Sequence, residues 1–319
     1  MLNLGSAALA AIVLAIASTS VQAQQKPIRI LVGLTAGGTL DNVTRLFADR
    51  LRVSLGQPVV VENRPGASGL IAIEALKAAP ADGLVLLSSA SGLITLLPHT
   101  FKTPRFDPTR DFLPVAQMAQ GDFILSVNAT TPARTAAEFA ALAKSEPKFR
   151  SFGTPHGTNP HLLATMFANA AGFAPVQVPY KGNSQALTDL LGGQIAAAFL
   201  SAGEGLGLHR SGKIRILAST GSQRSSLMPD IHTLKESGYD VEGSAWFALF
   251  APTGTPEGVV ERLGRATVEV AASPEVRDRL TQFGVEAAGL APKMFAEKIR
   301  VEYEHIGKQL RASGFKQQN

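Results

Sequence analysis

The sequence predicts an α/β protein, and two observations carry that prediction. Short aliphatic or β-branched runs alternate with segments of helical period from residue 26 onward, and this alternation indicates βαβ units with largely parallel sheets. The 319 residues also exceed one ordinary domain and suit two domains of roughly 150 residues each. The hydrophobic share of 45% is sufficient for well-filled cores.

Each element follows from its own pattern. The first helix is the clearest, because Val43, Phe47 and Leu51 recur at helical spacing on one face. Strands are expected at Ile28–Leu34, Pro58–Glu62, Leu84–Ser88, Phe123–Asn128, Val176–Tyr180, Ile195–Leu200, Ile214–Thr220 and Trp246–Ala251. Helices are expected at Asp41–Leu55, Ala136–Ser145, His161–Ala171 and Gln185–Leu191, and the stretch Pro256–Ser313 is predicted to be nearly all helical.

The N-terminal segment has the pattern of a cleaved signal peptide. Residues 1–25 carry no charged side chain, Ala7–Ala17 is apolar, and Val21-Gln22-Ala23 forms an A-x-A-like cleavage site. We expect residues 1–23 to be removed, so that the mature chain begins at Gln24. An uncleaved membrane anchor is the alternative, although the apolar run is shorter than the ~20 residues that span a bilayer.

Composition and motifs argue against several classes of protein. The chain has no Cys, which removes disulfides, thiolate catalysis and Cys-ligated metals. The net charge is +5, but Lys and Arg are scattered, so we expect no nucleic-acid partner. The G-x-S-x-G, phosphate-loop and dinucleotide-binding patterns are absent, and His156 and His161 lack a metal-ligand spacing. We therefore expect no catalytic residue, no metal and no cofactor.

Small-residue loops stand where strands meet helices. The first places Gly37 and Gly38 directly before a helix whose first turn points unpaired N–H groups outward. Such a loop can receive an anion, and we expect Gly38 to need a backbone that only glycine adopts. An ordinary tight turn capped by Thr39 or Asp41 is the alternative. Similar loops recur at Gly66–Gly69, Ser88–Gly92, Gly153–His161 and Ser201–Gly203.

Several blocks of the sequence, taken in order, resemble one family. The blocks are Pro27–Ile30, Gly37–Asp41, Val59–Ala67, Asp82-Gly83, Asp111–Val115, His161-Leu162, Val178–Gly182, Gly212–Arg215, Arg224-Ser225, Pro229-Asp230, Thr233-Leu234, Trp246 and Ala251–Pro256. They span essentially the whole mature chain, and Glu62–Ala67 and Val178–Gly182 are the most specific. The chain thereby resembles the Bug family, the extracytoplasmic solute receptors of tripartite tricarboxylate transporters.

The resemblance implies a two-lobe type II periplasmic-binding-protein fold with a ligand cleft between the lobes. On this basis we expect residues 24–123 and 248–319 to form lobe 1 and residues 124–247 to form lobe 2. Receptors of the family grip a carboxylate largely with backbone amides and ordered water from two loops of lobe 1. These loops correspond here to Ala36–Asp41 and Ser88–Gly92.

The expected ligand contacts come from both lobes. Lobe 1 is expected to supply Ala36, Gly37, Gly38, Thr39, Asp41, Ser89, Ala90 and Ser91, and lobe 2 Thr154, Thr158, His161, Tyr180, Lys181 and Ser201. For four of them a structural role stays open: Asp41 as a helix-start carboxylate, Tyr180 as hinge packing, His161 as a local hydrogen-bonder, and Lys181 as an exposed charge.

The function implied by the resemblance is that of a periplasmic receptor and not an enzyme. We expect a monomer that captures a small organic carboxylate and delivers it to membrane permease subunits. A sensory or interaction protein that uses the same cleft is one alternative. A periplasmic hydrolase or lyase is the other.

Overall fold

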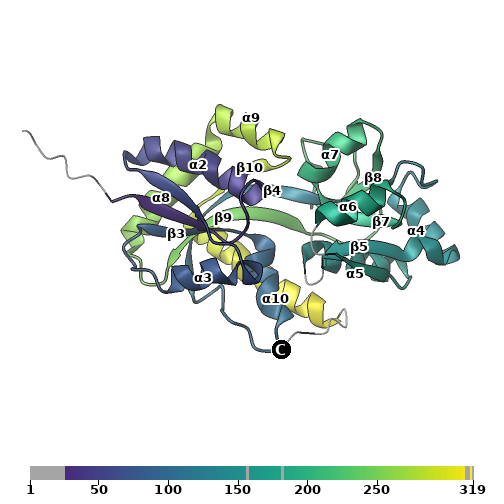
Figure 1. Cartoon of the computed structure of the whole chain (residues 1–319), viewed down its shortest axis with the longest axis horizontal. Coiled ribbons are helices and arrows are strands. Elements are labelled where there is room, and N and C mark those ends of the chain that lie inside the picture. Colours follow the sequence, from purple (N-terminus) through teal and green to yellow (C-terminus); the bar gives the residue numbers. More distant parts are fainter. Residues whose placement is uncertain (1–25, 156–157, 181–182, 313–316, 318–319) are drawn as a thin grey trace, which may run out of the picture.

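The structure, a computed structural model, describes residues 26–155, 158–180, 183–312 and 317. The predicted signal peptide and Lys181 therefore lie outside the described residues. Within the described ranges no helix is long and apolar enough to cross a membrane. The described strands form one continuous sheet that is shared between two lobes (Figure 1).

The sheet of the first lobe has the order β2-β1-β3-β9-β4, and β10 pairs with the other edge of β4. The strands are β1 (Ile28–Val32), β2 (Val59–Asn63), β3 (Val85–Ala90), β9 (Ser244–Pro252), β10 (Glu286–Leu290) and the first part of β4 (Phe112–Asn128). The helices are α2 (Thr39–Leu55), α3 (Leu70–Lys77), α8 (Glu257–Ala272), α9 (Pro274–Gln282) and α10 (Pro292–Ala312). Because β1 is parallel to β2 and to β3, these strands end at the same edge, which faces the second lobe.

The second lobe repeats the same plan on the rest of β4. Its strands are β5 (Ser151–Pro155), β6 (Val176–Tyr180), β7 (Ala197–Ser201) and β8 (Ile214–Ser219), and its helices are α4 (Ala136–Ser145), α5 (Asn159–Ala171), α6 (Asn183–Leu191) and α7 (Ala202–Arg210). Strand β5 runs parallel to β6 and β7, so all three end toward the first lobe.

Strand β4 connects the lobes and exchanges its partners between Asp122 and Phe123. Up to Asp122, which pairs with Ser244, it lies beside β9; from Phe123, which pairs with Ser201, it lies beside β7. Thr220 fixes the backbone of β4 at this point by two hydrogen bonds to Phe123. Its N–H donates to Phe123 O at 2.9 Å, and its Oγ1 accepts from Phe123 N at 3.0 Å. Figure 1 shows β4 passing from one group of helices to the other. We refer to this segment, where β4 changes partners, as the hinge.

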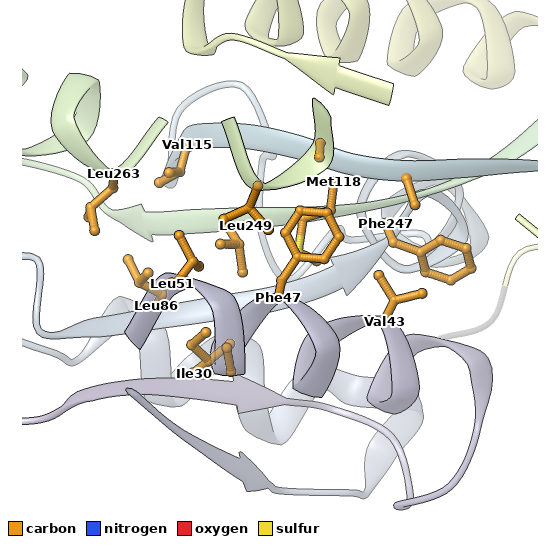
Figure 2. Packing of buried hydrophobic residues seen from close by; sticks show 14 of the residues in the cluster. Ile30, Val43, Phe47, Leu51, Leu86, Val115, Met118, Phe247, Leu249 and Leu263 are labelled. Carbon is orange, nitrogen blue, oxygen red and sulfur yellow. The ribbon is translucent and has the colours of Figure 1, made fainter. Parts of the chain in front are cut away.

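Each lobe buries its own core on both faces of the sheet. In the first lobe, Val43, Phe47 and Leu51 of α2 pack toward Ile30 and Leu249 (Figure 2), as the helical spacing predicts. On the opposite face a second cluster holds Leu31, Leu87, Trp246, Phe250 and Phe295. In the second lobe the two clusters centre on aromatic rings of α4, α5, β5 and β7 and on aliphatic side chains of α6, α7 and β8.

The structure adds three strand segments that the sequence patterns missed. Strand β5 occupies part of the predicted Gly153–His161 loop, and β4 begins at Phe112 instead of Phe123. The prediction that Pro256–Ser313 is nearly all helical is wrong over β10, Glu286–Leu290. These residues form a strand because β4 offers them backbone partners, with Glu286 opposite Gln120.

Candidate functional site

The loop after β1 turns sharply at Gly37. Gly37 has φ +88°, in the left-handed region that favours glycine, and its N–H donates to Asp41 Oδ2 at 2.9 Å. Gly38 has φ −77°, which any residue adopts, so the expectation that this position needs glycine is wrong. The position whose backbone favours glycine is Gly37. Ala36, Gly37 and Gly38 are exposed and Thr39 is half-buried, so the loop offers its backbone to solvent at the start of α2.

Asp41 holds this loop in place. Besides the Gly37 N–H it accepts hydrogen bonds from Arg45 Nε and from Asn63 Nδ2, each at 2.9 Å, and it is only 2% exposed. Burial alone would raise the pKa of Asp41, but the hydrogen bonds from Arg45, Gly37 and Asn63 outweigh it and keep the pKa below its usual value. Asp41 therefore links the loop, α2 and the end of β2.

We expect Asp41→Ala to lower the free energy of unfolding by about 1–3 kcal/mol, because three donors lose their acceptor and the Gly37 turn loses its anchor. Chemical denaturation measures this loss. Asp49→Ala is the matched control, since Asp49 is exposed on the same helix and its removal should change stability by less than about 0.5 kcal/mol. Equal effects of the two substitutions would contradict the anchoring role.

The prediction that Ser88–Gly92 is a loop is wrong for its first three residues, because Ser88, Ser89 and Ala90 end strand β3 and pair with β9. Ser88 turns into the core, where its Oγ lies 2.6 Å from Thr44 Oγ1, and Ser89 and Ser91 are each only 1% exposed, beside the half-buried Ala90. Ser91 Oγ donates to Ser244 O and accepts from Trp246 N, both at 3.4 Å. Ser91 thereby ties the end of β3 to the first residues of β9, next to the hinge.

The predicted residues of the second lobe are mostly held by hydrogen bonds within that lobe. Thr154, 1% exposed, donates to Gln177 Oε1 at 2.7 Å, and the Oγ of Ser201 caps α7 by accepting from Glu204 N. Tyr180 donates to Asp189 Oδ2 at 2.5 Å, and burial together with this bond raises the pKa of Tyr180 to about 12. Thr158 precedes α5 and His161 lies in its first turn, both half-buried.

Among the described residues, several contacts join the lobes near these loops. Asn159 Nδ2 donates to Ser91 Oγ at 3.4 Å, which brings the β3 loop of one lobe against the start of α5 in the other. Gly203 of α7 packs against Gly284, so closely that a Cβ on Gly203 would lie 2.4 Å from Phe283 O. A small apolar cluster of Leu96, Leu162 and Leu310 bridges the β3 loop, α5 and the end of α10.

Four residues that contact these loops were not among the predicted site residues: Asn159, Asn63, Gln177 and Gly284. Asn159 stands in the Gly153–His161 segment, where an Asn-Pro pair at a helix start could have drawn attention to it. The others become neighbours of predicted residues only through tertiary contacts. Among the residues that the structure describes, no three His, Asp or Glu side chains gather into a set that could hold a metal ion.

A separate cavity of about 760 Å³ lies at the hinge between α10, α5 and the segment that leads into β9. Asp122, Glu242 and Glu286 line it, and none of the described residues donates a hydrogen bond to the Asp122 carboxylate. None of the predicted ligand contacts borders this cavity, although Asn159 of the predicted Gly153–His161 loop does. The burial of Asp122 and the nearby Glu286 and Glu242 carboxylates raise its pKa to about 7.

The chain is similar, in sequence and in structure, to known solute receptors. The family model described as "Tripartite tricarboxylate transporter family receptor" matches residues 43–312. The periplasmic binding protein BugD superimposes with a TM-score of 0.78 at 30% identity, over 92% of this chain and 99% of BugD.

Two similar solved structures hold ligands. MatC of Rhodopseudomonas palustris, with bound malate, has a TM-score of 0.77 at 27% identity over 89% of this chain and 98% of MatC. The protein Rpa4515 of R. palustris, with adipate, has a TM-score of 0.80 at 30% identity over 90% of this chain and 97% of that protein. Malate and adipate are both dicarboxylates.

Proposed function

Because the chain belongs to the receptor family of tripartite tricarboxylate transporters, we propose that it captures a small organic carboxylate and delivers it to a membrane permease of that class. The malate and adipate bound to its structural neighbours support a carboxylate as the ligand. The family and these neighbours are solute-binding receptors, so the proposal includes no catalytic step.

The observation that carries the proposal is the meeting of strand ends from both lobes. Strands β1 and β3 of the first lobe and β5, β6 and β7 of the second all end at the junction, where Asn159 reaches Ser91. Helices α2, α5 and α7 begin at these loops, so their N-terminal N–H groups and the positive ends of their dipoles gather there. Such an arrangement stabilises a negative charge, such as that of a carboxylate group.

We propose that both lobes contact the ligand. The contacts on this proposal are Ala36, Gly37, Gly38, Thr39, Ser89, Ala90 and Ser91 from the first lobe, and Thr154, Thr158, His161, Tyr180, Lys181 and Ser201 from the second; Asp41, also expected from the sequence, supports the first set. Within the first set the exposed backbone of Gly37 and Gly38 is the best supported. Asp41 acts indirectly, because its carboxylate already accepts three hydrogen bonds from the protein.

Lobe closure around the ligand is part of the proposal. We propose that the chain first crosses between the lobes at Asp122–Phe123, where β4 exchanges partners. We propose the return near Ser244, where pairing with β4 begins, which is a few residues before the boundary at residue 248 expected from the sequence. A ligand that touches both lobes favours the closed arrangement by its differential affinity for that state. The contacts Ser91–Asn159 and Gly203–Gly284 belong to this closed arrangement.

The cellular setting is proposed from the relatives. A periplasmic location agrees with the description of BugD as a periplasmic binding protein and with the predicted removal of residues 1–23. A monomer that docks on the permease subunits is the simplest assembly for such a receptor. Detection of Met1 at the N-terminus of exported protein by mass analysis would contradict the predicted cleavage.

A carboxylate panel tests the ligand class. Saturation at a hundred times Kd should stabilise the protein by about 2.7 kcal/mol, which corresponds to a rise in Tm of roughly 5 °C for a chain of this size. Malate, succinate and adipate form the panel, and their uncharged diamides are the control. We expect a shift with at least one diacid and none with its diamide.

The same panel separates the alternatives. Mass spectrometry after incubation should recover the bound acid unchanged, whereas its conversion would support a hydrolase or lyase. The absence of a shift with every acid would contradict the proposed receptor. A sensory protein would also bind the acid, but would lack uptake activity when combined with the permease subunits.

A further inference from the structure

One carboxylate of the first lobe is held by a turn of the second lobe. Glu286 is the first residue of β10, and Val285 and Ala287 beside it pack in the core of the first lobe. Its Oε1 accepts hydrogen bonds from Ser226 N at 3.0 Å, from Ser225 Oγ at 3.1 Å and from the hydroxyl of Ser226. Among the described residues, no side chain of the first lobe donates to Glu286, so its described donors all come from the second lobe.

The two serines stand in a turn that the second lobe builds by itself. Met228, at the end of this turn, is buried among side chains of α6, α7 and β8, and its N–H donates to Ser225 O at 3.1 Å. The N–H of Leu227 donates to Ser225 Oγ, also at 3.1 Å. Because this bond uses a lone pair of the Ser225 oxygen, the hydroxyl proton is available for Glu286. The donors are thus held in position by the second lobe, and their contact with Glu286 requires little additional ordering.

The same part of the first lobe touches the second lobe at another point. Gly284, two residues before Glu286, is the residue against which Gly203 of α7 packs. The link between α9 and β10 therefore meets the start of α7 and the serine turn together. A rotation about the hinge that separates the two glycines would also withdraw Ser226 from Glu286. Since a hydrogen bond is lost beyond about 3.5 Å, a movement of about 1 Å would end this contact.

We propose that Glu286 and the turn of Ser225 and Ser226 form a latch between the lobes, which engages when the lobes close on the ligand. This proposal rests on the proposed receptor function and adds a positioning residue to it, because Glu286 acts on the ligand only through the closed state. Hydrogen bonds to a carboxylate are stronger than bonds between neutral groups. The latch therefore stabilises the closed state and slows the release of the ligand, which leaves when the lobes open.

Glu286→Ala tests the latch through the rates of ligand release and association. Stopped-flow and calorimetric measurements use malate, succinate and adipate, and the acid that binds most tightly serves as the probe. We expect release about tenfold faster, association within about threefold of the wild-type rate and an affinity about tenfold weaker, because the lost contact forms after the ligand has bound. Glu286→Gln is the conservative variant. Its side-chain oxygen can accept the same hydrogen bonds, and it should bind within about threefold of the wild type.

Glu242→Ala is the matched control. Glu242 lines the same cavity as Glu286, but its partner Lys235 lies in the second lobe, as Glu242 itself does. The substitution removes the same charge from the cavity without touching the latch, so affinity should stay within about twofold of the wild type.

Ser226→Ala tests the other side of the latch, because it removes one of the donors to Glu286. It should weaken binding about threefold in the wild type and should cause no further loss in Glu286→Ala, since residues in direct contact do not contribute additively. Additive losses would overturn the latch. Ser226 is exposed, so this variant should fold, and its binding with wild-type affinity would overturn the latch even if Glu286→Ala failed to fold.

The remaining outcomes separate the latch from the receptor function. Wild-type release from Glu286→Ala would overturn the latch and leave the carboxylate receptor intact. An equal loss in Glu242→Ala would also overturn it, because the charge of the cavity and not the contact between the lobes would then explain the effect. Failure of the wild type to bind any of the three acids would overturn the proposed function itself, and the latch with it.

Discussion

Gly203→Ala is expected to weaken ligand binding by at least tenfold while the protein still folds. The Cβ that alanine adds would lie 2.4 Å from Phe283 O, and the facing Gly284 is equally close, since its own Cβ would lie 2.2 Å from Gly203 Cα. These neighbours are backbone atoms and cannot rotate away as a side chain could. The first turn of α7 must therefore move away from the α9–β10 link, which separates the lobes.

The loss should appear in binding and not in folding. A ligand held by both lobes loses the contacts that closure provides, and a tenfold loss corresponds to about 1.4 kcal/mol. Alanine itself favours a helix over glycine by roughly 1 kcal/mol, so the free energy of unfolding should fall little. Calorimetry with the acid identified in the panel measures affinity, and small-angle scattering at saturation should show a larger radius of gyration than that of the wild type.

Gly207→Ala is the matched control. Gly207 lies one turn further along α7, and a Cβ there would meet no atom within 4 Å. This variant should gain helix propensity and keep wild-type affinity. If Gly203→Ala also bound with wild-type affinity, the Gly203–Gly284 contact would be unnecessary for the bound state, and the closure part of the proposal would fail.

The elements with strong periodic patterns were predictable from sequence. The apolar stripe of α2 (Val43, Phe47, Leu51) and the aliphatic strands β1 and β8 were placed within a few residues of their observed bounds. The first part of β4 was missed because it contains Pro114, Gln117 and Gln120, which do not look like a central strand. Gln117 is nevertheless fully buried, because Lys298 Nζ donates to its amide oxygen at 3.0 Å and Gln120 accepts from its amide nitrogen.

Strand β10 and the lobe contacts illustrate what sequence patterns leave out. Glu286–Leu290 is rich in Ala and Gly, which have low strand propensity, and it forms a strand only because β4 supplies the partner. The loops around Gly37, Ser91 and Ser201 could be identified from their small residues and their positions after strands. Their partners Asn159 and Gly284 could not, because those contacts depend on how one lobe is placed against the other.

Asp122, the residue at which β4 leaves the first lobe, is expected to make the stability of the protein depend on pH. Its carboxylate faces Glu286 of β10 and Glu242 before β9, and the Gly221 backbone covers it, since a Cβ on Gly221 would lie 2.5 Å from Asp122 Oδ2. The Lys and Arg side chains that line the same cavity have other partners: Lys235 pairs with Glu242, Arg224 with Glu236, and Lys298 donates to Gln117 Oε1. Burial and the two like charges accordingly raise the pKa of Asp122 from 3.8 to about 7.

The direction of the pH effect follows from this shift. Between about pH 4 and pH 7 the folded protein keeps a proton on Asp122 that the unfolded chain has already released. The contribution of this group to stability is therefore present at acid pH and is lost as the pH rises to about 7. Three pKa units correspond to about 4 kcal/mol, but Asp122 lines a water-accessible cavity, and screening should reduce the effect to about 1–3 kcal/mol.

Asp122→Asn should remove this loss, because a neutral amide of the same shape repels neither Glu242 nor Glu286. Urea denaturation at pH 8 should give a free energy of unfolding about 1–3 kcal/mol above that of the wild type, and at pH 5 the two proteins should differ little. Asp240→Asn is the control, since Asp240 borders the same cavity but is exposed, and it should change stability by less than about 0.5 kcal/mol at either pH. A gain in the free energy of unfolding for Asp122→Asn that is the same at pH 5 and pH 8, or no gain at pH 8, would contradict the prediction. Ionisation of Asp122 would then not destabilise the folded protein.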